Sequence, residues 1–424
     1  MDSLPPGPSA PRAVQTAAWL ARPGPFLVRA QRRYGDVFTM RIGGEPPWVM
    51  LAHPDAVREV FTGDPAVMHA GKANLILRPL VGHASVLLLD GRQHMRERKL
   101  MLPPFHGSRM AGYRDLVAAI AREHIAAWPR GEPLVLSTRM QAITLDVVLR
   151  VIFGVEEGAQ LTALRDRLRA LLARVFSVSS MLAMASAGPE RVERSGVYGR
   201  WLRPVDALLQ EQVEARRAAP GDDVLSLLLA ARHADGSPMS DRELRDELVT
   251  LLVAGHETTA TALSWAMERL TRMAGGWDAL RAGGEEYAEA AGKETLRLRP
   301  VLPVVLRNLQ ERTTIAGVDL PAGTVVAPSI FLVHRRPDLY PDPATFRPER
   351  FLGPEPQGGT YTWIPFGGGV RRCVGAAFAL MELRVVLAEL AAHVEAAPAR
   401  PQREATARRA ITLIPARGAE VVLS

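Results

Sequence analysis

The sequence predicts a mainly α-helical protein with a small β portion, and three observations carry this prediction. Apolar residues recur at helical spacing from about residue 92 to 300, with proline and glycine at the breaks. Two stretches, about 24–60 and 301–333, have the alternation and turns of short strands. Residues 334–372 are rich in Pro and Gly and longer than most structureless connections, so we expect them to build part of a site.

Several elements can be placed from local signals. Val37–Ile42 and Trp48–Leu51 are predicted strands on either side of a Gly/Pro turn at 43–47. Ala376–Leu390 is a predicted helix, and we expect Ala410–Leu413 to pair with Val421–Leu423 in a terminal hairpin.

Two helix starts carry capping signals. Asp223 stands before the apolar run that begins at Val224. Ser240 and Glu243 have the spacing of a capping box, which predicts a long helix running to about Met273.

Composition limits the classes of function. The 424 residues contain no Gly/Ser linker, and we expect one domain over 1–424 in a chain that is 47% hydrophobic and 23% charged. The net charge of +7 comes almost entirely from arginine, without a basic run interleaved with aromatic residues, so nucleic-acid binding is not expected. The single cysteine excludes a disulfide scaffold and fits the cytoplasm. Neither a signal peptide nor a membrane anchor is recognisable, and we expect a cytoplasmic monomer.

The single cysteine, Cys373, lies in the glycine-rich segment Phe366–Gly375. Two adjacent arginines, Arg371 and Arg372, favour the thiolate over the thiol, and so would the N-terminus of the following helix. One thiolate held in this way suits the axial ligand of a haem iron. The alternative is a small apolar residue in the core.

A second motif lies inside the long helix, over Ala254–Thr259. Gly255 lowers helix stability by about 1 kcal/mol relative to alanine in a helix interior, so we expect it to have a structural or functional role. The hydroxyl of Thr258 can bond back to the carbonyl of Ala254 and loosen the helix. Glu257 beside Thr258 would suit proton delivery during dioxygen activation. The alternative is helix packing, with Glu257 on a wetted face.

Two pairs of charged or polar residues and one single arginine have more than one interpretation when each is taken alone. Glu294 and Arg297 share a helical face at i, i+3, where most such pairs are surface salt bridges of little value. His94 and Arg98 are four residues apart and share a helical face. They could bind an acidic group or simply lie on a solvated face. Arg307 follows an apolar run and is either a surface residue at the end of a strand or a further anion-binding residue.

In this order, these pieces resemble the cytochrome P450 superfamily, in its soluble bacterial type, over the whole chain. The haem-binding signature matches at Phe366, Gly369, Arg371, Cys373 and Gly375. The Glu-x-x-Arg pair matches at Glu294 and Arg297, its third partner at Arg350, and the oxygen-activation motif at Ala254–Thr259. The resemblance implies the P450 fold, with haem between the long distal helix and the helix following Cys373.

The resemblance also implies roles for these residues. Cys373 would be the metal ligand of haem b, with a structural triad of Glu294, Arg297 and Arg350 anchoring the haem-binding meander and cysteine loop at about 334–375. Glu257 and Thr258 would be the catalytic pair. The further cofactor-binding residues would be His94, Arg98, Ala254, Arg307, Phe366, Gly369, Arg371 and Gly375.

The implied activity is that of a haem-thiolate monooxygenase. It would activate O2 to hydroxylate or epoxidise an apolar small molecule such as a terpenoid, a fatty acyl chain or a polyketide. Electrons derived from NAD(P)H would come from a ferredoxin or flavodoxin with its reductase, because the chain has no flavin domain of its own. The alternative is oxidative cyclisation or coupling, or peroxide-driven oxidation, in secondary metabolism.

The substrate-contacting regions implied by the family are mostly apolar here. They correspond to Gly71–Leu89, Phe176–Pro189, Leu252–Thr258, Val301–Val305 and Ala410–Thr412. Within them we expect pocket contacts from Leu75, Val253, Val304, Val305 and Ile411. Asn74, His83 and Ser85 could supply polar contacts, and the alternative is that each is a loop residue facing water.

Overall fold

The computed structural model describes residues 4–107, 109–155, 158–175, 177, 180, 183–184, 187–354 and 357–424. It forms two compact units, and each collects segments that are far apart in the sequence. The first unit comprises Met1–Met68, Arg114–Ile143 and Thr258–Ser424, and the second comprises His69–Tyr113 and Thr144–Glu257. The expected single domain stays a prediction.

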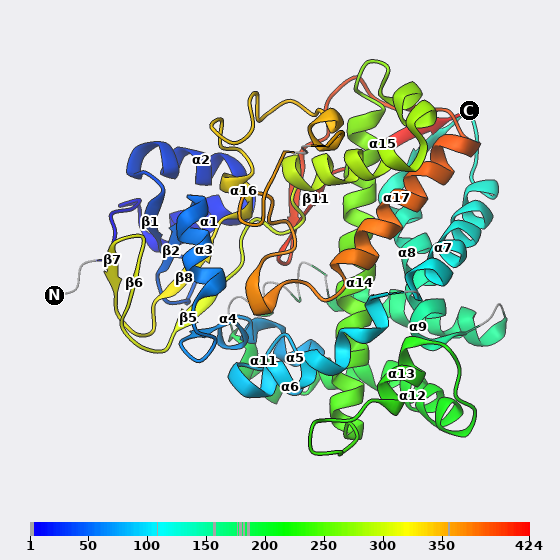
Figure 1. Ribbon diagram of the computed structural model, residues 1–424, viewed down its shortest axis with the longest axis horizontal. Coiled ribbons are helices and arrows are strands. Elements are labelled where there is room, and N and C mark those ends of the chain that lie inside the picture. Colours follow the sequence, from blue (N-terminus) through cyan, green and yellow to red (C-terminus); the bar gives the residue numbers. More distant parts are fainter. Residues whose placement is uncertain are drawn as a thin grey trace. The chain divides into compact units, whose positions relative to one another are not determined.

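The first unit contains a five-stranded sheet in the order β1-β2-β8-β5-β3 (Figure 1). β1 pairs antiparallel with β2, with Val37 opposite Leu51, whereas β2 pairs parallel with β8, with Trp48 opposite Val325. β5 runs antiparallel to β8. The strands are β1 Val37–Met40, β2 Trp48–Leu51, β3 Met68–His69, β5 Arg307–Leu309 and β8 Val325–Pro328.

Both faces of this sheet are covered, which explains the continuous apolar run in β2. Val49 and Leu51 pack with Val57 and Phe61 of α3 in one hydrophobic cluster. Trp48 and Met50 belong to a second cluster with residues of α1 and α2. Successive side chains of a strand point to opposite faces, so a strand buried on both sides is apolar at every position. The helices are α1 Arg12–Ala21, α2 Pro23–Tyr34 and α3 Pro54–Thr62.

The strand-rich start expected at 24–60 is therefore only partly correct. The strands and the turn between them are confirmed, but α2 and α3 flank them. Both helices begin with proline, which is pre-organised for the first helical turn.

The expected terminal hairpin is wrong. β11 pairs with β10 before it, and β12 pairs with both β4 and β9. The turn after β11 leads to β12 in a different sheet, so the last two strands are neighbours in sequence only. The strands are β4 Pro133–Val135, β6 Thr313–Ile315, β7 Val318–Leu320, β9 Ala396–Pro398, β10 Thr406–Arg409, β11 Thr412–Pro415 and β12 Glu420–Leu423, with β6 and β7 forming a hairpin.

The helical part of the first unit is centred on α15 and α17, which lie side by side (Figure 1). The expected helix after Cys373 is confirmed as α17, Ala376–His393, and α15 spans Gly276–Leu298. The region 334–372 is irregular as predicted, with only short turns of helix. The remaining elements are α16 Ile330–Val333, η3 Pro348–Phe351 and η4 Gly369–Arg371, together with parts of α7 Arg109–Ala126 and α8 Leu136–Phe153.

The second unit is helical. Two predicted caps are confirmed: Asp223 accepts a hydrogen bond from the Ser226 amide (2.8 Å), and the Ser240 amide donates to the Glu243 carboxylate (2.7 Å). The long helix α14 is Asp241–Leu270 and begins in this unit. The other helices are α4 Ala70–Ala73, η1 Leu75–Leu77, α5 Arg78–Val81, α6 Gly91–Met101, η2 Pro103–Phe105, α9 Ala159–Val175, α11 Pro189–Arg194, α12 Val197–Ala218 and α13 Val224–Ala230. Among the described residues, none of the helices is both long and apolar enough to cross a membrane.

Candidate active site

Cys373 lies in a tight loop at the start of α17. Its backbone N–H donates to the carbonyl of Phe366 (3.0 Å), and that of Arg372 donates to the carbonyl of Gly369 (3.1 Å). The cap of α17 is Gly375, two residues after the cysteine, and the cysteine side chain is exposed. The chain thus presents a thiol on a short, internally bonded loop, and the alternative of a core cysteine is excluded.

Gly368 and Gly369 are required by the close packing of this loop against α3. Gly369 has φ +62°, and a Cβ there would lie 1.9 Å from the carbonyl oxygen of Phe61 in α3. A Cβ at Gly368 would lie 2.1 Å from the Phe61 ring. Only glycine allows the loop to approach α3 this closely. Gly375 differs, because a Cβ there would meet nothing within 4 Å among the described atoms.

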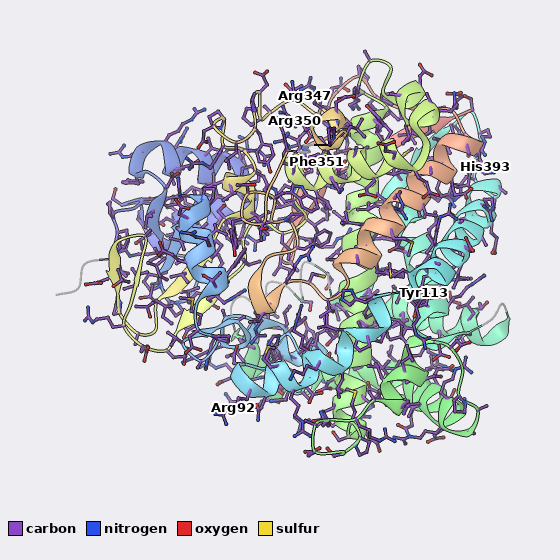
Figure 2. The ribbon with its side chains drawn as sticks, in the orientation of Figure 1. Arg92, Tyr113, Arg347, Arg350, Phe351 and His393 are labelled. Carbon is purple, nitrogen blue, oxygen red and sulfur yellow. The ribbon has the colours of Figure 1, made fainter. Side chains whose placement is uncertain are left out.

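The structure brings the three predicted triad residues together. Arg297 donates two hydrogen bonds to the Glu294 carboxylate, at 2.6 and 2.8 Å, and both side chains are 0% exposed. The Arg350 Nε lies 3.5 Å from the same carboxylate. In Figure 2, Arg350 lies beside α15, in contact through η3. The surface-pair alternative for Glu294 and Arg297 is therefore wrong.

The triad also holds the backbone of the irregular segment. Arg297 donates to the carbonyls of His334 (2.8 Å) and Pro343 (2.9 Å), and the Arg347 amide donates to Glu294 (2.9 Å). A guanidinium has five donors in a fixed fork, so one buried arginine can bind several carbonyls that have no secondary-structure partner.

His334 is a further anchor in this segment. Burial lowers its pKa to about 3, and its Nε2 accepts a hydrogen bond from the Ile364 amide (2.8 Å). A neutral imidazole is therefore maintained here, and it links the two ends of the segment before the cysteine loop.

The motif in α14 has a more accessible side and a buried side. Ala254 is exposed and Gly255 and Thr258 are half-buried, whereas His256 and Glu257 are buried. The residues 254, 255 and 258 share one side of a helix. The Nε2 of His256 lies 3.8 Å from the Glu257 carboxylate, and the hydroxyl of Thr144 donates to the His256 carbonyl (3.0 Å). The alternative with Glu257 on a wetted face is excluded.

The four predicted anion-binding residues lie on three elements. In the second unit, His94 is 2% exposed on α6 and Arg98 follows one turn later. In the first unit, Arg307 is 6% exposed on β5 and donates to the Leu306 carbonyl (2.8 Å), and Arg371 lies in η4.

The predicted pocket residues are divided between the two units. Leu75 in η1 and Val253 in α14 belong to the second unit and are half-buried. Val304 and Val305 pack at the edges of the two sheet clusters, and Ile411, 39% exposed, lies at the tip of the β10–β11 hairpin. The Leu413 amide donates to the Val301 carbonyl (2.8 Å), which joins this hairpin to the 301–305 segment. Part of the predicted region Phe176–Pro189 lies outside the described residues.

Comparison with known protein families decides what this arrangement is. The family model for cytochrome P450 matches residues 5–274 and 286–418. The chain belongs to the cytochrome P450 family. The family resemblance stated from the motifs is therefore confirmed.

The named relatives and solved structures agree with this assignment. Cytochrome P450 135B1 of Mycobacterium tuberculosis is 42% identical, over 99% of this chain and 91% of its own. Cytochrome P450 135A1 of the same species is 37% identical, over 99% and 95%. A retinoic acid-bound cyanobacterial P450, CYP120A1, has a TM-score of 0.81 at 24% identity, with both chains fully covered. The haem domain of cytochrome P450DA has a TM-score of 0.85 at 21% identity, over 99% and 97%. These two structures support the P450 fold.

Membership makes this P450 a monooxygenase with a haem-thiolate cofactor, and the cysteine loop fits that group. Zinc sites need three or four protein ligands, yet among the described residues no group of His, Cys, Asp and Glu that could hold a metal includes Cys373. A single exposed thiol on a glycine-rich loop suits an iron whose other ligands come from a porphyrin.

Contacts to α14 hold the loop at residues 82–86 of this P450, and sequence reasoning missed them. The Ala84 amide donates to Asp246 (2.9 Å) and the Val86 amide to Glu247 (2.6 Å), both on α14. Ser85 is buried and bonded to Thr250, and His83 is bonded to Glu193 at 2.6 Å. The expected polar substrate contacts at His83 and Ser85 are thus side chains engaged within the protein. Asn74 donates to the Leu87 carbonyl (3.4 Å).

A buried carboxyl on α17 was also missed. Burial raises the pKa of Glu382 to about 8, partly offset by a hydrogen bond with Thr259, the neighbour of Thr258. Glu382 is therefore a neutral acid at pH 7, and it links α17 to the last residue of the Ala254–Thr259 motif in α14.

We expect Glu382 to make the stability of this P450 depend on pH. The folded state keeps a proton that the unfolded state releases above pH 4.5, so the free energy of unfolding falls as pH rises toward 8. Glu382→Gln should remove this fall, with a relative gain of roughly 2–4 kcal/mol at pH 8.5 compared with pH 5.5. Denaturant unfolding at the two pH values measures it, with Glu389→Gln on the same helix as the control. An equal pH dependence in wild type and Glu382→Gln would exclude a neutral Glu382.

Proposed function

We propose that this P450 uses O2 to hydroxylate or epoxidise an apolar small molecule, with electrons from a separate ferredoxin or flavodoxin and its reductase. The observation that carries the proposal is the exposed thiol of Cys373 in the signature loop, together with an intact Glu257–Thr258 pair. A single cysteine fits the reducing cytoplasm in which such carriers work. That the enzyme is a monomer stays a prediction.

The proposed cofactor contacts follow the family motif. Cys373 binds the iron, and Phe366, Gly369 and Gly375 shape the loop around it. Arg307, Arg371, His94 and Arg98 provide cationic or hydrogen-bonding groups for the two propionates. Ala254 provides a small surface on α14, where a larger side chain would obstruct a flat ring.

The haem, when bound, supplies the chemistry of dioxygen activation. The chain's own contribution is orientation and the supply of protons. Thr258 is half-buried on the more accessible side of the motif in α14, and its hydroxyl can both donate and accept a proton. Glu257, buried next to His256, is the carboxylate from which a proton would be passed to that hydroxyl.

The substrate proposal rests on the character of the pocket candidates. Leu75, Val253, Val304, Val305 and Ile411 are aliphatic, and none brings a charge. We infer an aliphatic substrate, such as a terpenoid, a fatty acyl chain or a polyketide, that is oriented mainly by shape. Screening a lipophilic library for substrate-induced shifts of the Soret band identifies the binding members.

Thr258→Ala tests the proposed proton path. Without the hydroxyl, electrons would still be consumed but protons would arrive at the wrong step, so we expect product formed per NADPH to fall about tenfold or more. Ser264→Ala is the matched control, because Ser264 lies on the same helix with its hydroxyl bonded to the Ala260 carbonyl (2.7 Å). Full coupling in Thr258→Ala would remove Thr258 from the proposed path.

A further inference from the structure

Three side chains with metal-binding atoms meet in the second unit, separately from the catalytic motifs. Glu97 comes from α6, His233 from the turn between α13 and α14, and Glu243 from the first turn of α14. One ligand atom from each lies within 4.8 Å of the other two. The His233 Nε2 is 3.8 Å from the Glu97 carboxylate and 4.0 Å from that of Glu243.

The imidazole of His233 is the feature that the fold itself does not explain. Its side chain is 1% exposed, and neither ring nitrogen has a hydrogen-bond partner among the described residues. Leaving a buried polar atom without a partner costs about 1–3 kcal/mol, so such a group usually serves a purpose. Here the Nε2 points between two carboxylates at distances too long for hydrogen bonds.

The carboxylates face a deficit of positive charge. One oxygen of Glu97 also lacks a hydrogen-bond partner among the described residues, and its side chain is 4% exposed. Arg96 lies 4.0 Å from Glu97, but its side chain is 47% exposed and it also pairs with Asp235. A cation among these groups would remove the cost of bringing them together.

The two distances from His233 to the carboxylates are close to those of a metal centre. Zn²⁺ binds His nitrogen and carboxylate oxygen at about 2.0–2.2 Å, so ligand atoms in a tetrahedral site lie about 3.4 Å apart. The distances of 3.8 and 4.0 Å need only a few tenths of an ångström of contraction. We propose that Glu97, His233 and Glu243 form a binding site for a divalent transition-metal ion, with Zn²⁺ as the expected occupant.

The chemistry of the donors favours zinc over calcium and magnesium. Imidazole suits zinc and its neighbours in the first transition row, whereas Ca²⁺ and Mg²⁺ prefer oxygen ligands alone. Glu243 is 26% exposed, which gives the ion an entry path and leaves room for water as a fourth ligand. Ser240 donates two hydrogen bonds to the same carboxylate, at 2.7 and 2.8 Å, and these fix its position.

The bound ion would tie together three segments of the chain. It would connect α6, the turn closed by the His233 and Ser237 backbones, and the start of α14. Because His94 and Arg98 lie on α6 beside Glu97, the ion would also steady the helix that carries two proposed propionate contacts. The site does not depend on that proposal, since none of its ligands is a catalytic or haem-contacting candidate.

Zinc binding to the untagged, haem-loaded enzyme tests the site. After dialysis against a chelator, calorimetric titration with ZnCl₂ should show one ion per chain, and elemental analysis should show zinc beside iron. His233→Ala and Glu97→Gln should each weaken zinc binding at least about tenfold. Zinc-edge anomalous diffraction from soaked crystals should place one peak between the three side chains.

The control is His83→Gln, which alters an exposed histidine that contacts a single carboxylate in the same unit, and it should bind zinc like the wild type. The carbon monoxide spectrum of each variant reports whether its haem pocket is intact, and Glu97→Gln keeps the size of the side chain if His233→Ala does not fold. Failure of the wild type to retain zinc would overturn the site. Equal binding by wild type, His233→Ala and Glu97→Gln would also overturn it.

Discussion

Replacing Cys373 with serine is expected to abolish the thiolate-type Soret band of the reduced carbon monoxide complex and to reduce monooxygenase turnover to background. The hydroxyl of serine stays protonated at neutral pH and cannot supply the electron density of a thiolate, which favours O–O cleavage. The loop itself should persist, because its closing bond runs between the backbone of residue 373 and the Phe366 carbonyl (3.0 Å). The variant therefore tests the iron ligand without disrupting the fold of the loop.

Two further variants make this result specific. Val370→Ser adds a hydroxyl at an exposed position of the same loop (38% exposed) and should leave the spectrum unchanged. Cys373→His should move the band to the position of imidazole-ligated haem. An unaltered band in Cys373→Ser would mean that another side chain binds the iron, and the proposed role of Cys373 would be wrong.

The second large effect is expected from Glu294→Ala. Glu294 and Arg297 are 0% exposed, and the change leaves the guanidiniums of Arg297 and Arg350 buried beside each other without their carboxylate. Removing one partner of a buried ion pair costs about 3–5 kcal/mol. Because Arg297 also holds the carbonyls of His334 and Pro343, we expect poor haem incorporation as well as lower stability.

Thermal unfolding and the ratio of haem to protein measure this effect. Glu289→Ala is the matched control, because Glu289 lies on the same helix and pairs with Lys293 at 2.6 Å, with a side chain that is 35% exposed. A partly exposed pair of this kind contributes about 0–1 kcal/mol. Similar losses in the two variants would show that the buried triad has no special structural role.

Elements with strong local signals were predictable from the sequence. The caps at Asp223 and Ser240 depend on residues within one turn, and both form as expected. β1 and β2 could be placed because their apolar runs flank a turn of only a few residues. The pairing of β12 with β4 and β9 was not predictable, because its partners are set by the tertiary fold and not by the adjacent turn.

The residues of the candidate site also fall into two groups, those that the sequence predicts and those that it does not. Cys373 and the Glu294–Arg297 pair belong to motifs with fixed spacing, so they were found without coordinates. Glu382, His334 and Asp246 were not found from the sequence, because an isolated Glu, His or Asp carries no sign of burial in the sequence. Their chemistry comes from what packs around them: burial raises the pKa of Glu382 and lowers that of His334.

The parallel pairing of β2 with β8 has a consequence for synthesis on the ribosome. Trp48–Leu51 leaves the exit tunnel early, but its partner Val325–Pro328 is made about 280 residues later. At typical elongation rates this interval is on the order of 15–60 s. For that time an entirely apolar strand has no β8 beside it, which makes the nascent chain prone to aggregation. We therefore expect the yield of folded enzyme to depend on expression temperature and on chaperones that shield the N-terminal strands.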